Sequence, residues 1–232
     1  MNTVFKFYLQ AWTLLAISTG AAIVWILSSL SKWSYGWRTA WQFAVITLVA
    51  ATALYPVMGS MAKMRDRMTE DVPLTLDGMT YMQYSIYNDL NTTMDLSQDY
   101  DAIRWMQANI VGSPVIVEGN MVEYHWGNRY TIYTGLPSVV GWNWHQRQQR
   151  AALPGGTVES RVADVSDFYL STNMDDVQGF LDKYGVRYII VGQLERALYI
   201  GPGLEKFEEM DGVIWQEVYR NGDTVIYHVG SL

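Results

Sequence analysis

Two long apolar runs without a charged side chain dominate the start of the chain, over residues 7–30 and 41–58. The first has 24 residues, and at ~1.5 Å rise per residue it makes roughly 36 Å of helix, enough to cross a ~30 Å hydrocarbon layer with some tilt. The second is shorter, and Pro56 and Gly59 mark its end. The pattern predicts a transmembrane helical hairpin; a cleaved signal peptide and a buried hairpin in a soluble protein are the alternatives.

Later in the chain the hydrophobic pattern alternates between helix and strand. Asp99 can cap a helix that runs to about Ile110, and an apolar strand follows over 115–118. Asn173 begins a second helix that Gly185 ends, and a strand follows over 186–191. Two helix-then-strand units with continuous apolar strands predict parallel pairing in a covered α/β sheet. Two final strands, 214–219 and 224–229, flank an Asn-Gly turn and predict a C-terminal β-hairpin.

We therefore predict an α/β fold class with two N-terminal transmembrane helices and a small α/β domain whose sheet is partly parallel. Residues 1–62 would form the hairpin, 63–98 a linker, and 99–232 the α/β domain.

Charge divides the chain at the same place as hydropathy. Residues 1–65 carry five Lys or Arg and no acid, and residues 66–232 carry 23 acids and 11 bases, so charges of +5 and −12 sum to −7. Basic residues lie on both sides of the hairpin, and their number alone does not decide its orientation. The acidic second part has no basic stripe, which excludes nucleic acid as a partner; the predicted partner of the first part is a lipid bilayer.

The segment 114–150 is rich in aromatic residues, histidine and arginine. In open α/β sheets ligands bind beyond the carboxyl ends of the strands, so residues after both predicted strands should share one rim with this segment. Aromatic faces stack on sugar rings, and arginine forks match phosphates and carboxylates. The alternative is an ordered loop whose tryptophans cover the sheet. The predicted substrate-binding residues are Glu118, Tyr124, His125, Arg129, Trp142, Trp144, His145, Arg147, Arg150, Glu195 and Arg196.

Several kinds of chemistry have no matching motif. The absence of cysteine excludes thiolate catalysis and disulfides. There is no P-loop, dinucleotide-binding glycine motif or nucleophile elbow. Glu118, Glu123 and His125 match no metal-ligand spacing, so we expect neither a metal nor a cofactor.

Five segments carry a resemblance: NTVFKFYLQAW, TLDGMTYM, PVIVEGN, RYTIYTGLPSVVGWNWHQRQQR and KYGVRYIIVGQLER. Together they resemble the C-terminal part of the YYY family of bacterial and archaeal multi-pass membrane proteins. That resemblance implies a relation to GT-C-type glycosyltransferases, which use a lipid-linked sugar donor and carry an extracytoplasmic C-terminal domain.

From this resemblance we expect a multi-pass cell-membrane protein whose soluble domain contributes binding of a lipid-linked sugar or glycan acceptor. Proteins of that type carry their catalytic acid in an early extracytoplasmic loop, so no residue here receives the catalytic role. Upstream transmembrane helices of a longer parent would be further partners, with Met1 an internal methionine. The alternative is a non-enzymatic, membrane-anchored envelope module that binds glycan or a partner protein.

Overall fold

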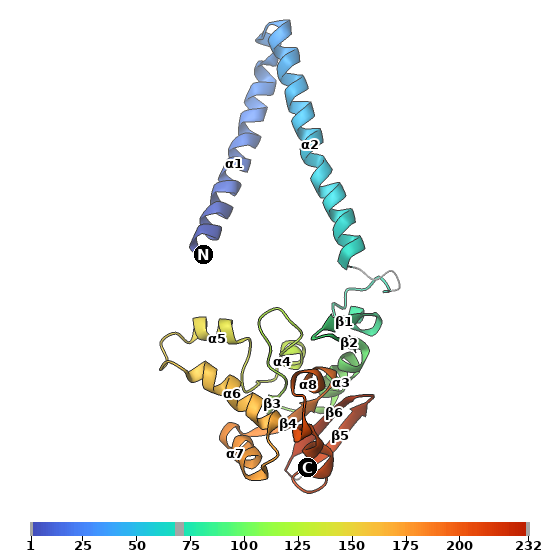
Figure 1. Ribbon diagram of the computed structural model, residues 1–232. Helices are drawn as coiled ribbons and strands as arrows, with labels where there is room; N and C mark the ends of the chain where they lie inside the picture. Colours follow the sequence, from blue (N-terminus) through green and yellow to red (C-terminus); the bar gives the residue numbers. More distant parts are fainter. Residues whose placement is uncertain (1, 68–71, 231–232) are drawn as a thin grey trace. The chain divides into compact units, whose positions relative to one another are not determined.

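The computed structural model describes residues 2–67 and 72–230, and the chain divides into two units, 1–68 and 69–232. The first unit is a helical hairpin of α1 (Asn2–Ser29), the short 3-10 helix η1 (Leu30–Lys32) and α2 (Tyr35–Arg67) (Figure 1). The candidate spans Thr3–Lys32 and Tyr35–Asp66 have mean hydropathies of 1.8 and 1.7. Their length and apolar composition are what a membrane-spanning helix requires.

The helix that contains the second apolar run is longer than the run itself. Pro56 lies inside α2, and the helix continues past Gly59 to Arg67. A proline removes one backbone donor, and the Met, Ala, Lys and Arg residues that follow Gly59 favour helix strongly. The helix therefore continues nine residues beyond the apolar run 41–58.

The second unit is built on a mixed four-stranded sheet. Its strands are β3 (Val115–Val117), β4 (Val186–Val191), β5 (Trp215–Asn221) and β6 (Thr224–Val229), in the order β3-β4-β6-β5. β3 pairs with β4 in parallel, while β4 and β6, and β6 and β5, pair antiparallel. The predicted α/β fold, parallel pair and C-terminal hairpin are confirmed.

Helices cover both faces of this sheet, and β4 is apolar on both sides over residues 189–191 for that reason. Ile189 and Val191 belong to a core shared with α6 (Thr157–Leu170), α7 (Met174–Tyr184) and α9 (Glu205–Glu209). Ile190 lies in the opposite core, with α3 (Leu96–Asn109) and α4 (Arg129–Thr134). Successive residues of a strand point to opposite faces, so β4 belongs to both cores.

The predicted cap of the first helix is wrong, and that of the second is confirmed. The cap of α3 is Asp95, whose side chain accepts a hydrogen bond from Ser97 N at 2.9 Å. Asp99 lies one turn further on and is buried. In α7, Asn173 accepts from Asp175 N, and Gly185, at φ 61°, ends the helix.

Part of the predicted linker is ordered and belongs to the second unit. It contains the 3-10 helix η2 (Thr80–Tyr84) and the hairpin of β1 (Ile86–Asp89) and β2 (Thr92–Asp95). Met82 and Met94 from these elements are 0% and 1% exposed. The remaining elements are α5 (Asn143–Gln149), α8 (Gln193–Leu198) and η3 (Pro202–Leu204).

Candidate functional site

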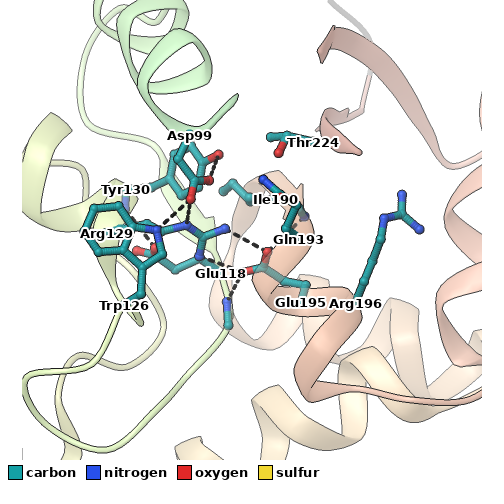
Figure 2. A network of polar contacts seen from close by, with 12 residues as sticks. Asp99, Glu118, Trp126, Arg129, Tyr130, Ile190, Gln193, Glu195, Arg196 and Thr224 are labelled. Atoms are coloured by element: carbon teal, nitrogen blue, oxygen red, sulfur yellow. Dashed lines mark hydrogen bonds and ion pairs between the residues drawn. The ribbon is translucent and has the colours of Figure 1, made fainter. Parts of the chain in front are cut away.

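Beyond the carboxyl ends of β3 and β4 lies a buried polar network centred on Arg129 (Figure 2). Its guanidinium donates to Asp99 Oδ2 from Nε at 2.8 Å, and to both oxygens of Glu195 from Nη1 and Nη2 at 3.1 and 2.9 Å. Asp99 also accepts from Trp126 Nε1 at 2.7 Å and from the Tyr130 hydroxyl at 2.8 Å. The network joins α3, α4 and α8.

Glu195 connects the two parallel strands to this network. Its carboxylate accepts the backbone N–H of Gly119, just beyond β3, at 2.7 Å, and that of Gly192, just beyond β4, at 2.9 Å. A Cβ at Gly119 would come within 2.9 Å of the Glu195 carboxylate, which explains the need for glycine there. Burial opposes ionisation, but the charge of Arg129 and these hydrogen bonds outweigh burial and lower the pKa of Glu195.

Glu118 occupies the start of α4. Its carboxylate accepts the backbone N–H groups of Tyr130 and Thr131, each at 2.9 Å. A carboxylate at a helix N-terminus satisfies donors that the helix itself leaves free. Burial nevertheless raises the pKa of Glu118 to about 6, against the lowering effect of Arg129 and the two N–H groups.

Three predicted site residues, Glu118, Arg129 and Glu195, are therefore brought together, but not as the lining of an open site. They are 1%, 1% and 0% exposed, and their partners are protein groups. Closed from solvent, they hold the ends of the strands and the loops that follow. We assign them a positioning role, because buried side chains of this kind do not face an open site.

A separate aromatic cluster, formed by Tyr124, Trp142 and His145, lies at the surface of the same loop region. The ring centroids of Tyr124 lie 5.3 Å from Trp142 and 5.5 Å from His145, and Trp142 and His145 are 5.6 Å apart. The Tyr124 hydroxyl and His145 Nε2 lie 3.0 Å apart. Tyr124 is 77% exposed and adopts φ 69°, a left-handed conformation that bulky residues rarely take.

Trp144 stands beside this cluster on α5 and is 54% exposed. The Glu123 carboxylate accepts its backbone N–H, which fixes the first turn of α5 against the loop that carries Tyr124. Asn120 donates from Nδ2 to Gly141 O at 3.1 Å and joins the same two loops again. The aromatic cluster and Trp144 are therefore held on a loop pair with several cross-links.

The other predicted residues take no part in these ring contacts. His125 Nδ1 contacts Asp89 of β1 at 2.6 Å. Arg147 forms an ion pair with Glu159 at 2.8 Å, and Arg150 Nε donates to Gln146 at 2.7 Å. Arg196 points away from the buried network and donates to Asp223 O at 3.2 Å (Figure 2).

Sequence reasoning missed Asp99, Trp126 and Tyr130 as parts of the network. A signal for Asp99 was present, because it lies on the same helical stripe as Leu96, Ile103 and Met106, all of which are buried. An acid on the apolar stripe of a helix must find a buried partner. Nothing in the sequence singles out which arginine supplies it.

No protein-family model matches the chain, and no curated protein matches it either. Among solved structures, it is similar to two C-terminal globular domains of oligosaccharyltransferase from Archaeoglobus fulgidus. One has a TM-score of 0.38 and 12% identity and covers 56% of this chain and 96% of that domain. The other has a TM-score of 0.32 and 14% identity, with coverages of 57% and 94%. Similarity of this degree does not establish a shared function.

Proposed function

We propose that this chain is the membrane-anchored C-terminal part of a GT-C-glycosyltransferase-like protein, and that its second unit binds a glycan or lipid-linked sugar through Tyr124, Trp142, Trp144 and His145. Two apolar helices support the anchoring. The sequence resemblance to the YYY family supports the class of protein. In this proposal the soluble unit faces the extracytoplasmic side and the catalytic acid belongs to another part of the parent protein.

The observation that carries the proposal is the conformation of Tyr124. The left-handed conformation of Tyr124, at φ 69°, costs energy, and burial does not offset that cost because the residue is 77% exposed. The left-handed backbone brings the ring over Trp142 and His145. Strain of this kind is found where a side chain is held for a ligand, and an exposed group of aromatic rings suits the apolar faces of sugars.

The buried network supports the proposal indirectly. Glu118, Arg129 and Glu195 fix the strand ends from which the loops depart, so the aromatic cluster is pre-organised before a ligand arrives. Pre-organisation lowers the entropic cost of binding. It also means that the positions of these rings depend on residues that no ligand touches.

Binding can be tested with the full chain in lipid nanodiscs. The probes are a polyprenyl phosphate glucose in the bilayer, a soluble gluco-oligosaccharide, and polyprenyl phosphate without sugar. Tyr124→Ala and Trp144→Ala should each weaken sugar binding about tenfold, as the loss of a stacking side chain does. Tyr84→Ala removes a 44% exposed aromatic residue elsewhere in the unit and serves as the matched control.

Both variants should keep the melting temperature within a few degrees, because their side chains are exposed. If Tyr124→Ala and Trp144→Ala both bind the two sugar probes with wild-type affinity, the aromatic surface is not the binding site. Binding of the soluble oligosaccharide alone, with no preference for the lipid-linked sugar, would favour the non-enzymatic glycan-binding module.

A further inference from the structure

A small cavity of about 110 Å³ lies between α5 and α6, next to the aromatic cluster. Its lining includes Gln146 from α5, Arg150 at the C-cap of α5, Thr157 and Arg161 from α6, and Gly141 from the preceding loop. Gly141 precedes Trp142 directly, so the cavity adjoins the cluster along the chain. Pockets that enclose a whole small molecule usually measure ~300–1,000 Å³. This one has room for a single functional group of a larger ligand.

Both arginines of the cavity are positioned by one hydrogen bond each. Arg150 Nε donates to Gln146 Oε1 at 2.7 Å, and Arg161 Nη1 donates to Val139 O at 2.9 Å. Arg161 also lies over the Tyr184 ring, 5.2 Å from its centroid. A guanidinium has five N–H donors. Each of these two side chains therefore keeps donors beyond those that fix its position.

The charge at the cavity is unbalanced. Among the described residues no acid lines it, and neither Arg150 nor Arg161 lies within ion-pair distance of a carboxylate, although the charge of Arg161 acts on Asp164 one turn further along α6. The neighbouring Arg147, by contrast, is paired with Glu159 at 2.8 Å. Two guanidinium groups around one small cavity repel each other, and an anion between them would replace that repulsion with two charge-assisted hydrogen bonds.

We infer that the cavity between α5 and α6 is an anion subsite that binds a phosphate or carboxylate group through Arg150 and Arg161. The inference deepens the proposed function, because it makes the ligand of the adjacent aromatic surface a negatively charged sugar. The subsite itself rests only on the cavity and its two arginines. Planar guanidinium groups match the oxygens of phosphate and carboxylate in pairs, which a neutral sugar hydroxyl does not offer.

The test uses the full chain in zwitterionic nanodiscs and isothermal titration with inorganic phosphate, glucose 1-phosphate, glucuronate and glucose. We expect the charged ligands to bind more tightly than glucose. Arg150→Gln and Arg161→Gln should each weaken glucose 1-phosphate by about tenfold or more while glucose changes little. Arg147→Gln removes the same charge from α5 at a residue outside the cavity lining, and should change each affinity less than about twofold.

Arg161 also donates a hydrogen bond to Val139 O. If Arg161→Gln does not fold for that reason, Arg150→Gln and Arg161→Lys, which keeps the charge, serve as the test variants. A polyprenyl phosphate glucose in the nanodisc carries the phosphate on a lipid. Comparing its affinity with that of glucose 1-phosphate shows whether the subsite prefers a lipid-linked or a soluble phosphate. Equal affinities for glucose and its phosphate, or an equal loss in Arg147→Gln, would overturn the subsite.

The two proposals fail in different ways. If inorganic phosphate binds through Arg150 and Trp144→Ala changes no sugar affinity, the subsite is supported and the glycan surface is refuted. Neutral oligosaccharide that binds through Tyr124 and Trp144, with no measurable phosphate binding, would refute the subsite and leave the proposed function intact.

Discussion

Arg129 is one buried cation set among three buried carboxyl groups, and its side-chain hydrogen bonds go to two of them. Glu195 receives two of its N–H groups and Asp99 a third, while Glu118 receives none. Glu118 is accordingly the carboxyl whose pKa burial raises, to about 6, while that of Glu195 is lowered. A proton that enters this network near neutral pH is therefore expected on Glu118.

The raised pKa of Glu118 predicts a gain in stability on mild acidification. A carboxyl whose folded-state pKa lies above its unfolded value near 4.5 binds its proton more tightly when folded, so its contribution is full below pH 4.5 and lost as the pH rises through 6. Between pH 7 and pH 5 the linkage is worth about 1 kcal/mol. Urea unfolding of the full chain in detergent, followed by tryptophan fluorescence, measures it.

Glu118→Gln supplies the comparison, since it keeps the shape but cannot titrate. The wild-type chain should gain about 1 kcal/mol more than this variant between pH 7 and pH 5. Equal pH profiles for the two proteins would mean that Glu118 stays ionised in the folded state, held by the N–H groups of Tyr130 and Thr131.

The chemistry of single residues was predictable to a limited depth. Glu118 and Glu195 follow the two parallel strands, and the rule for strand ends brought them together correctly. Their burial was not predictable, because it depends on Arg129 at the start of α4 and on Asp99 of α3, two helices on one face of the sheet. Those contacts join residues 30 to 76 positions apart.

At the level of elements, local pattern predicted the strands and the α7 cap well and the start of α3 poorly. Asp95 and Asp99 are both of a residue type that caps helices. Asp95 is the cap of α3 because β2 ends at this residue and places it at the start of the helix. The ordered stretch from η2 to β2 was missed because its burial rests on long-range contacts of Met82 and Met94. Short polar strands have little periodicity of their own.

A buried lysine caps the C-terminal end of α6. Lys206 Nζ donates to Tyr169 O, Ser171 O and Gly203 O at 2.9, 3.0 and 2.8 Å. Burial lowers the pKa of Lys206 to about 7, while these three carbonyls and the Phe168 and Phe207 rings favour its charged form. This arrangement requires η3 to approach the end of α6 closely, and Gly203 permits it.

Two glycine substitutions test that contact against a matched control. A Cβ at Gly203 would overlap the carbonyl oxygens of Tyr169 and Leu170, so Gly203→Ala should cost about 1–3 kcal/mol in unfolding free energy. Gly179 lies on the exposed side of α7, where a Cβ would meet no atom within 4 Å, and Gly179→Ala should stabilise the helix by about 0.5–1 kcal/mol. Chemical denaturation of both variants measures these changes, and a neutral Gly203→Ala would mean that η3 is free to move away.

At the scale of the whole molecule, hydropathy and charge divide the chain at one place. The apolar hairpin carries +5 over residues 1–65, and the rest carries −12. The division agrees with the two units of the structure, 1–68 and 69–232. The division into two units was predictable because long apolar helices depend on composition over a long window, whereas a binding site depends on a few long-range contacts.

The proposed ligand decides the side of the membrane on which the second unit is expected to lie. Lys32 and Arg38 lie at the turn of the hairpin, while Lys6, Lys63 and Arg65 lie at its open end. The count of bases weakly favours a cytoplasmic second unit, but the difference is small, and large domains are translocated largely regardless of charge. The proposed use of a lipid-linked sugar requires the extracytoplasmic side. We expect alkaline phosphatase fused after Leu232 to be active in cells. A green fluorescent protein fused there should be dark after Sec-dependent insertion. The reverse pair of results would place the second unit in the cytoplasm and remove the basis for a lipid-linked donor.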